Sequence, residues 1–281
     1  MNIIDAHLHI QPWKMLKPEV LARMAGDRRD AEQIKTFIEN PLAFVKHLDA
    51  SGISKAVVVN YPSPDVMGFT EEVNDFVMKY CAAAPDRLIP CGAIHPRFNK
   101  QPEKAMDKLL KKQKIKAIKV HPPHQLYQAN AYRTGLKALG ILYKRAEKEG
   151  VPVIIHTGTS IFPGARNVYA DPLPIDDVAL DFPKLKIIIA HGGRPLWMET
   201  CFFLMRRHKN CYLDLSGIPP QNVLKYFPRI SEIADRTMFG SDWPGPMIKS
   251  IKANAEAMAA LPFDQDTKEK ILFRTAQAVF G

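Results

Sequence analysis

Short runs of β-branched and apolar residues recur along the chain, and helical spacing of apolar positions fills most of the intervals between them. Continuous apolar runs of this kind are typical of parallel strands that are covered on both faces. The runs predict strands at Ile3–Ala6, Lys55–Val59, Leu88–Ile94, Ile115–Val120, Val151–Ile155, Leu185–Ala190, Cys211–Leu215 and Thr237–Gly240.

The intervals predict helices, several of which open with proline, a residue that is tolerated in the first helical turn. They are Pro41–Ala50, Glu71–Ala84, Pro102–Lys112, Thr134–Lys148, Asp176–Phe182, Pro195–His208, Pro220–Ala234, Pro246–Ala260 and Asp266–Val279. Strands that alternate with helices over 281 residues predict an α/β fold of the (β/α)8, or TIM, barrel type.

No stretch has the composition of an interdomain linker, so residues 1–281 are predicted to form one barrel domain. The segment from Gln11 to Asn40 is too long for a simple connection between a strand and a helix. We expect residues 11–40 to form a small helical insertion at the barrel mouth, after the first strand.

Composition narrows the class of protein further. Hydrophobic residues make up 46% of the chain, enough to bury a full core. No apolar run is long enough to cross a bilayer, and the N-terminus lacks the features of a signal peptide. The cysteines, Cys81, Cys91, Cys201 and Cys211, form no C-x-x-C motif, so reduced thiols in a cytoplasmic protein are expected.

The formal net charge of +10 is spread over many predicted helices, with one dense stretch at Lys108–Lys119. Aromatic residues do not interleave with these charges, and no nucleic-acid motif is present, so we expect a solvated helix and no nucleic-acid partner. A positive field would help to attract a small anionic substrate.

Ionisable and polar residues lie at the carboxyl ends of the predicted strands, where barrel enzymes build their active sites. In strand order they are His7 and His9, Asn60, His95, Lys119 and His121, His156, His191, Asp214 and Ser216, and Asp242. Chance placement would scatter the histidines over helices and loops.

His7 and His9 are two residues apart at a strand end, so both are expected to point into the barrel and to bind one ion. Asp5 shares their parity and is expected to support them. His156 and Asp242 lie at matching ends of other strands and complete a predicted metal site. Imidazole and carboxylate ligands suit Zn²⁺, although other divalent metals bind the same donors.

His191 precedes two glycines, which allow a tight turn or a close backbone approach. It is interpreted as either a second metal ligand or a catalytic acid/base, because an imidazole titrates near neutral pH. Asp242 could both bind the metal and accept a proton from water. Its alternative role as a helix cap is weaker, because it lies several residues before the helix expected after Pro246.

Lys119 shares inward parity with His121, and three interpretations of it stay open: binding a substrate carboxylate, carboxylation to bridge two metals, or pairing with a carboxylate or snorkelling. Two interpretations of His121 also stay open: it lines the pocket, or the prolines that follow it place it in a loop. The candidate substrate contacts, for each of which a surface-loop role is the alternative, are His124, Tyr127, Arg166, Arg194 and Trp243.

Taken together, four segments resemble the amidohydrolase-related group of the amidohydrolase superfamily, which includes aminocarboxymuconate-semialdehyde decarboxylase. They are Ile4-Asp5-Ala6-His7-Leu8-His9, His156, His191-Gly192-Gly193 and Phe239-Gly240-Ser241-Asp242-Trp243-Pro244, and they run in the family's order over the whole chain. The resemblance implies one divalent metal, usually zinc, on the residues matching His7, His9, His156 and Asp242, with His191 catalytic. It also implies two metals if Lys119 is carboxylated, and a homodimer in many members.

Hydrolysis of an ester, lactone or amide by metal-activated water is the leading prediction, with a carboxylate of the substrate held by Arg194 or Lys119. The alternative is nonoxidative decarboxylation of an unsaturated or aromatic carboxylic acid. A non-catalytic metal-binding barrel is the third prediction, and it is disfavoured because His191 and Asp242 exceed what a closed site needs.

Overall fold

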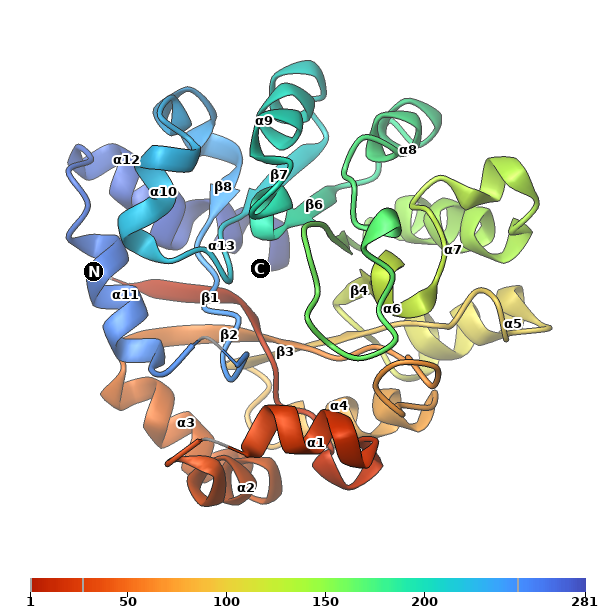
Figure 1. Ribbon diagram of the computed structural model, residues 1–281, viewed down its shortest axis with the longest axis horizontal. Coiled ribbons are helices and arrows are strands. Elements are labelled where there is room, and N and C mark those ends of the chain that lie inside the picture. Colours follow the sequence, from red (N-terminus) through yellow and green to blue (C-terminus); the bar gives the residue numbers. More distant parts are fainter. Residues whose placement is uncertain (1, 27, 247) are drawn as a thin grey trace.

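The computed structural model describes residues 2–26, 28–246 and 248–281. Within them a single parallel sheet of eight strands follows sequence order, each strand pairing with the next (Figure 1). The strands are β1 (Ile3–Leu8), β2 (Ile53–Val59), β3 (Leu88–Gly92), β4 (Ala117–Val120), β5 (Val153–His156), β6 (Ile187–Ala190), β7 (Cys211–Asp214) and β8 (Thr237–Met238). Every predicted strand is confirmed.

The two ends of the sheet are joined by backbone hydrogen bonds between β1 and the segment after β8. The Ala6 N–H donates to the Phe239 carbonyl at 2.9 Å, and the His9 N–H donates to the Trp243 carbonyl at 2.7 Å. The Asp242 N–H donates to the His7 carbonyl at 2.8 Å. These bonds close the sheet, so the predicted (β/α)8 barrel is confirmed, and they place Asp242 beside the end of β1.

Helices surround the strands (Figure 1). They are α1 (Pro18–Ala25), α2 (Ala31–Glu39), α3 (Pro41–Ala50), α4 (Glu72–Cys81), α5 (Pro102–Asp107), α6 (Pro122–Gln125), α7 (Lys137–Lys148), α8 (Ile175–Asp181), α9 (Met198–Arg207), α10 (Val223–Tyr226), α11 (Ile251–Ala259), α12 (Gln265–Glu269) and α13 (Thr275–Phe280). All the predicted helices have a counterpart, and α6 was not predicted.

Two helices differ from their predicted bounds, one in where it begins and one in its continuity. The helix predicted from Pro246 begins at Ile251, because the Ser250 hydroxyl accepts the Ala253 N–H and caps it there. Its predicted part at Met247 lies outside the described residues. The helix predicted over Pro220–Ala234 is divided into short pieces around Pro228, which has no N–H to continue a helix.

Apolar side chains form two layers. An inner cluster includes Val57, Ile89, Ile154, Ile188 and Met238, and α13 packs against it through Ala276 and Val279. An outer cluster joins the opposite faces of the strands to the surrounding helices. Because the inside of the barrel is filled by side chains rather than left as a pore, polar groups collect at its carboxyl end.

The segment predicted as an insertion contains α1 and α2, and Asp27 within it lies outside the described residues. Phe37 of α2 and Phe44 of α3 pack on Trp243, with ring centroids 6.1 and 5.7 Å away. Trp243 is therefore 2% exposed and belongs to this aromatic cluster. This packing leaves little of the ring exposed, and its role as a substrate contact stays a prediction.

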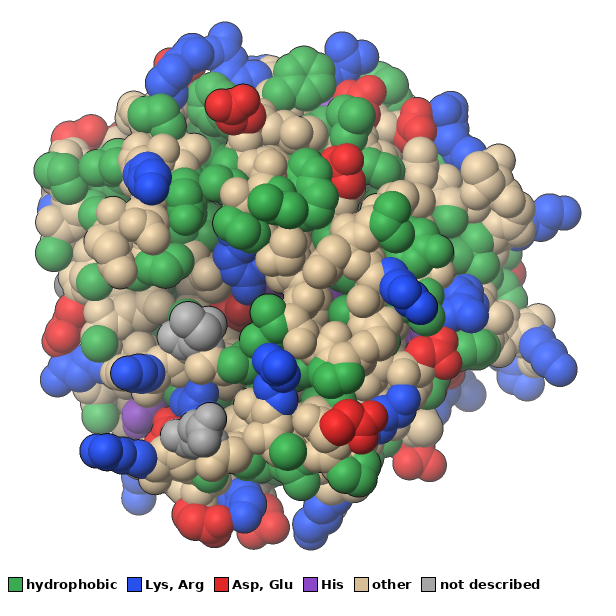
Figure 2. Space-filling view, viewed as in Figure 1, with side chains coloured by type: hydrophobic (Ala, Val, Ile, Leu, Met, Phe, Trp, Pro, Cys, Tyr) green, Lys and Arg blue, Asp and Glu red, His purple; other side chains and the backbone are tan. Residues whose placement is uncertain are grey.

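Charged side chains are spread over the surface, and Figure 2 shows Lys and Arg around the whole outline of one face with Asp and Glu between them. Two lysines of the dense stretch pair with carboxylates, Lys108 with Asp75 and Lys111 with Asp107, as a solvated helix would. No helix in the described ranges is long and apolar enough to cross a membrane. The cysteines are free and buried.

Candidate active site

A cavity of about 400 Å³ opens at the carboxyl end of the barrel. Its ionisable lining includes His9, Lys119, His156, His191, Arg194 and Asp242. These residues come from strands that are far apart in sequence, and the barrel brings their carboxyl ends to one rim. Met24 from α1 and Ile248 also line it, so the segment after β1 contributes to the cavity wall.

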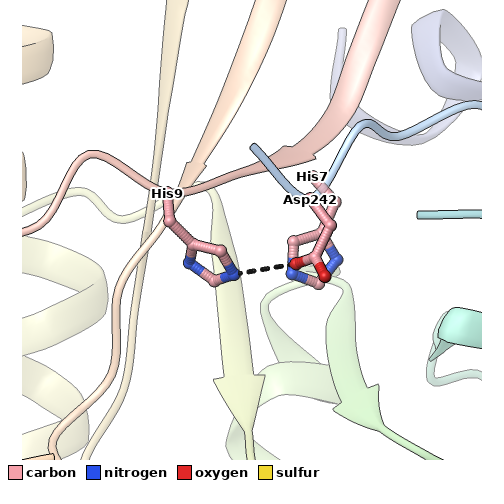
Figure 3. A group of neighbouring side chains, drawn as sticks. All are labelled: His7, His9 and Asp242. Atoms are coloured by element: carbon pink, nitrogen blue, oxygen red, sulfur yellow. Dashed lines mark ion pairs between the residues drawn. The ribbon is translucent and has the colours of Figure 1, made fainter. Parts of the chain in front are cut away.

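Three side chains form a compact group of N and O donors. His7, His9 and Asp242 each offer one atom, and these atoms lie within 4.8 Å of one another (Figure 3). Donors that share one ion at about 2.0–2.2 Å lie at most about 4.4 Å apart, so a small contraction would suffice. The predicted pairing of the two first-strand histidines with the carboxylate after β8 is present in the geometry.

The orientation of His9 favours a cation at this point. Its Nδ1 lies 2.9 Å from the Val59 carbonyl, which can only accept, so Nδ1 carries the proton and Nε2 has a lone pair. That Nε2 faces Oδ1 of Asp242 at 3.2 Å. Two atoms that both accept can face each other only with a proton or a cation between them, and a divalent cation bound by both would take the place of the proton.

His7 is buried and oriented by a carboxylate. Its Nδ1 donates to Oδ2 of Asp214 at 2.5 Å, and Ser216 Oγ lies 3.2 Å from the same nitrogen. Nε2 therefore presents its lone pair, as it does in metal-binding histidines that donate their other N–H to a carboxylate. Burial and the charge of Lys119 lower the pKa of His7 well below its usual value, which keeps the ring neutral.

Asp242 is held as a carboxylate. Burial alone would raise its pKa, but the hydrogen bond with His9 and the charge of Arg194 outweigh burial and lower the pKa below its ordinary value. Both oxygens face nitrogen atoms. Oδ1 lies 3.2 Å from Nε2 of His9, and Oδ2 accepts from Nη2 of Arg194 at 3.2 Å. Asp242 does not cap a helix, because Ser250 does so.

Asp5 does not share the inward position of His7. The pairing of β1 with β2 shifts register between Asp5 and Leu8, which breaks the strict alternation on which the prediction depended. The Asp5 carboxylate accepts the backbone N–H of His7 at 3.1 Å and that of Ser241 at 2.9 Å. It supports the site through the backbone, and burial raises the pKa of Asp5 to about 7.

His156 lies in the cavity wall but outside the three-residue donor group. Its Nε2 donates to the Gly158 carbonyl at 3.1 Å, and its ring stacks on His121 with centroids 3.8 Å apart. A ligand bond from His156 would use its other nitrogen or a rotated ring. Its role as a fourth ligand stays a prediction.

His191 is oriented by the strand-end turn. It has a φ of 65°, and Gly192 and Gly193 follow at φ of 53° and 73°, so the expected tight turn is present. Nδ1 of His191 lies 3.0 Å from the Ser216 carbonyl, to which it donates, so Nε2 is an acceptor. The ring centroid lies 4.8 Å from that of His7, which places His191 beside the donor group.

Arg194 presents an unused donor. Its Nε donates to the Gly217 carbonyl at 2.9 Å and its Nη2 to Asp242, whereas Nη1 is buried with no hydrogen-bond partner. The backbone here packs closely, because a Cβ on Gly158 would lie 2.2 Å from the Arg194 carbonyl oxygen. A buried guanidinium N–H without an acceptor is costly, and an anionic group in the cavity would satisfy it.

Lys119 lies at the bottom of the cavity, and at 1% exposure it cannot snorkel to solvent. Its Nζ is 3.3 Å from Nε2 of His7. Burial lowers its pKa to about 8, against the charges of Asp214 and Asp242, which raise it. Contact with a substrate carboxylate and carboxylation to bridge two metals both stay predictions.

The remaining predicted residues divide between the cavity and its surroundings. His121 and His124 line the cavity. Tyr127 does not, because its hydroxyl donates to Oε1 of Gln125 at 2.6 Å behind the wall. Arg166 is exposed on a loop and is likewise absent from the cavity lining. The structure therefore does not bring these two residues into the cavity, and their roles as substrate contacts stay predictions.

Asn60 and His95, also at strand ends, do not line the cavity. The Asn60 amide donates to the Ile10 carbonyl at 2.9 Å. Tyr61 and Ser160, by contrast, line the cavity and were not predicted. The only sequence signal for them is their position in the loops that follow β2 and β5, which many other residues share.

Comparisons with known proteins give one family and a set of similar folds. A family model described as amidohydrolase matches residues 4–281. A comparison with curated proteins gave no match. Among solved structures, an uncharacterised TIM-barrel protein from Bordetella bronchiseptica is 24% identical with a TM-score of 0.78, covering 99% of this chain and 98% of its own.

Two further solved structures have a stated reaction. A dihydroxybenzoic acid decarboxylase from Polaromonas sp. JS666, with bound manganese and the inhibitor 2-nitroresorcinol, is 18% identical with a TM-score of 0.72, covering 100% of this chain and 97% of its own. A 4-oxalomesaconate hydratase from Rhodopseudomonas palustris is 17% identical with a TM-score of 0.69, covering 99% and 95%. At these identities the likenesses establish the barrel fold.

Proposed function

Because this chain belongs to the amidohydrolase family, we propose that it is a metal-dependent lyase that removes CO2 from an unsaturated or aromatic carboxylic acid. The buried, unpartnered Nη1 of Arg194 beside Asp242 carries the proposal, since it marks a place for a carboxylate next to the metal donors. We further propose that the chain forms a single domain in which residues 11–40 are an insertion. We also propose that the protein is cytoplasmic, because free thiols persist in that compartment.

Hydrolysis, the leading prediction from sequence, is less well supported than decarboxylation. The two similar structures described above with a stated reaction are a decarboxylase and a hydratase, and both reactions are those of lyases. The cavity also has apolar walls, among them Met24, Phe162 and Ile248, which suit an unsaturated ring or chain.

The donor group would hold one divalent ion through His7, His9 and Asp242, with His156 as the proposed fourth ligand. Histidine and carboxylate donors fit both Zn²⁺ and Mn²⁺. When bound, the ion supplies Lewis acidity to oxygen atoms of the substrate. A second ion would require carboxylation of Lys119.

The protein's own residues then divide the work. The guanidinium of Arg194 fixes the substrate carboxylate by charge-assisted hydrogen bonds, which orient the carbon–carbon bond to be broken. His191, neutral and with Nε2 as an acceptor, can take a proton from a substrate hydroxyl. The carbon that loses CO2 must receive a proton from another group.

A direct assay tests the proposal. Protein loaded with Mn²⁺ or Zn²⁺ is incubated with a panel of hydroxybenzoates that includes 2,6-dihydroxybenzoate, and CO2 is measured against loss of the acid. Stoichiometric CO2 release that disappears after chelation is expected. Turnover of ester or lactone probes with no CO2 from any acid would instead support hydrolysis and reject the proposal.

Replacing Arg194 by lysine tests the carboxylate contact. Lysine keeps the charge but loses the planar fork of donors, so we expect KM for the acid to rise about 10–100-fold, corresponding to a charged hydrogen bond of about 1.5–3 kcal/mol. Bound metal should stay stoichiometric. Steady-state kinetics and metal analysis check both, and an unchanged KM would remove Arg194 from the substrate site.

Replacing Asp214 by asparagine tests the support of His7. The neutral amide orients the imidazole less strongly, so the dissociation constant for Mn²⁺ should rise about 10–100-fold in equilibrium dialysis. Asp176→Asn is the matched control, because Asp176 pairs with His208 at 2.6 Å in a part-buried Asp–His pair outside the cavity. Equal weakening in both variants would contradict the role of Asp214.

A further inference from the structure

One histidine of the cavity is bonded on both sides to hydroxyl groups. Nδ1 of His124 lies 2.9 Å from the Tyr61 hydroxyl, and its Nε2 lies 2.7 Å from Oγ of Ser160. All three side chains line the cavity. A hydroxyl both donates and accepts, so this arrangement satisfies either tautomer of the imidazole.

The other cavity histidines with bonded rings are restricted to one tautomer. His9, His156 and His191 each place a ring nitrogen against a backbone carbonyl, respectively that of Val59, Gly158 and Ser216. A carbonyl can only accept, so that nitrogen keeps its proton and the opposite nitrogen stays an acceptor. These rings can take up a proton from the substrate, but they have no N–H to offer toward it.

We propose that Tyr61, His124 and Ser160 form a proton relay, in which Tyr61 protonates the carbon that loses CO2. The inference rests on the proposed decarboxylation, which consumes one proton for each carboxylate converted. It assigns to Tyr61 the acid that the reaction needs and that the metal donors and His191 do not provide.

The transfers balance along the relay. The electron pair of the breaking carbon–carbon bond stays on the substrate carbon and takes the proton of the Tyr61 hydroxyl as CO2 departs. In the same step the Tyr61 oxygen takes the Nδ1 proton of His124, Nε2 takes the hydroxyl proton of Ser160, and Ser160 takes a proton from solvent water. His124 changes tautomer without becoming charged, so no ion is created in the buried wall.

Packing holds this relay in line. The Tyr61 ring stacks on His121 at 4.8 Å between centroids, and His121 stacks on His124 at 3.6 Å. Tyr61 is 3% exposed, and burial raises its pKa well above the usual value, so its hydroxyl stays protonated at neutral pH. Ser160 is only half-buried, so solvent can restore its proton.

Three variants test the relay on 2,6-dihydroxybenzoate. Tyr61→Phe removes the acid, Ser160→Ala removes the solvent end, and His124→Gln keeps groups that can bond both hydroxyls but cannot change tautomer. We expect kcat to fall about 10²–10³-fold in Tyr61→Phe and His124→Gln, with KM and bound metal unchanged. Ser63→Ala is the control. The Ser63 hydroxyl donates to the backbone carbonyl of His124 at 3.3 Å and does not bond the imidazole, so its loss should leave the relay intact.

A second readout isolates the proton transfer. Incubation with resorcinol in D2O, without CO2, should exchange deuterium into the ring carbon that carried the carboxylate, and ¹H NMR follows the loss of that signal. Wild type and Ser63→Ala should exchange, whereas the three relay variants should not. Ser160→Ala and His124→Gln decide the matter even if Tyr61→Phe fails to fold.

The outcomes separate the two proposals. A wild-type protein that neither releases CO2 nor exchanges deuterium overturns the proposed function, and the relay with it. A wild-type protein that does both, while Tyr61→Phe and His124→Gln keep kcat and exchange within threefold, overturns the relay alone.

Discussion

Replacing His9 by alanine is expected to leave the purified protein without stoichiometric metal and to lower kcat/KM by more than about 100-fold, the upper range for residues that only support ligands. His9 contributes one of three donors within 4.8 Å, and without it only two of that group and the proposed ligand His156 remain to hold the ion. Metal analysis after dialysis, together with CO2 release, measures both effects.

His9 is a cleaner target than His7. The His9 side chain is 16% exposed, so alanine leaves a space that water can fill. Removing His7 would leave Asp214 and Lys119 buried without their shared partner, and loss of folding would obscure the result. His208→Ala, outside the cavity, is the matched histidine control, and full metal retention in His9→Ala would reject the ligand assignment.

Replacing His191 by asparagine is expected to keep bound metal and to lower kcat about 10²–10⁴-fold, the usual contribution of a positioned acid/base group. Asparagine tolerates the left-handed backbone that His191 adopts at φ 65°. Its amide can also donate to the Ser216 carbonyl in place of Nδ1. The variant therefore removes the accepting Nε2 with little change in the turn.

Two measurements decide the outcome for His191. Metal content separates a catalytic role from that of a metal ligand, which was the alternative interpretation. The dependence of kcat on pH separates a catalytic role of His191 from a purely structural one. Loss of the base should remove the fall in kcat on the acidic side of the pH profile. Full activity in His191→Asn, or loss of its metal, would contradict the proposed acid/base role.

The strands and the main site residues could be predicted from local pattern. Buried parallel strands require continuous apolar runs, and barrel topology brings the residue after each run to one rim. The cavity at that rim is lined by His9, Lys119, His156, His191 and Asp242. His7 is buried directly beside it, with a donor atom within 4.8 Å of those of His9 and Asp242. Helix starts were predicted less well, because a side-chain cap such as Ser250 decides them locally.

Other features had no signal in the sequence. The register shift between Asp5 and Leu8 moves Asp5 away from its expected face, since pairing with β2 overrides simple alternation. Trp243 resembles a substrate contact by position, but the aromatic rings of α2 and α3 cover it. Its burial depends on helices that lie some 200 positions away along the chain.

The sequence by itself determined the barrel and the first-strand histidine pair, because both follow from periodicity within a few residues. Only the tertiary structure decided which nitrogen of each histidine is free, because that depends on whether a carbonyl, a carboxylate or a hydroxyl from another strand faces the ring. His9 and His191 face carbonyls and His7 faces a carboxylate, whereas His124 faces two hydroxyls. Long-range packing therefore assigns the proton positions, and the chemistry of the site follows from them.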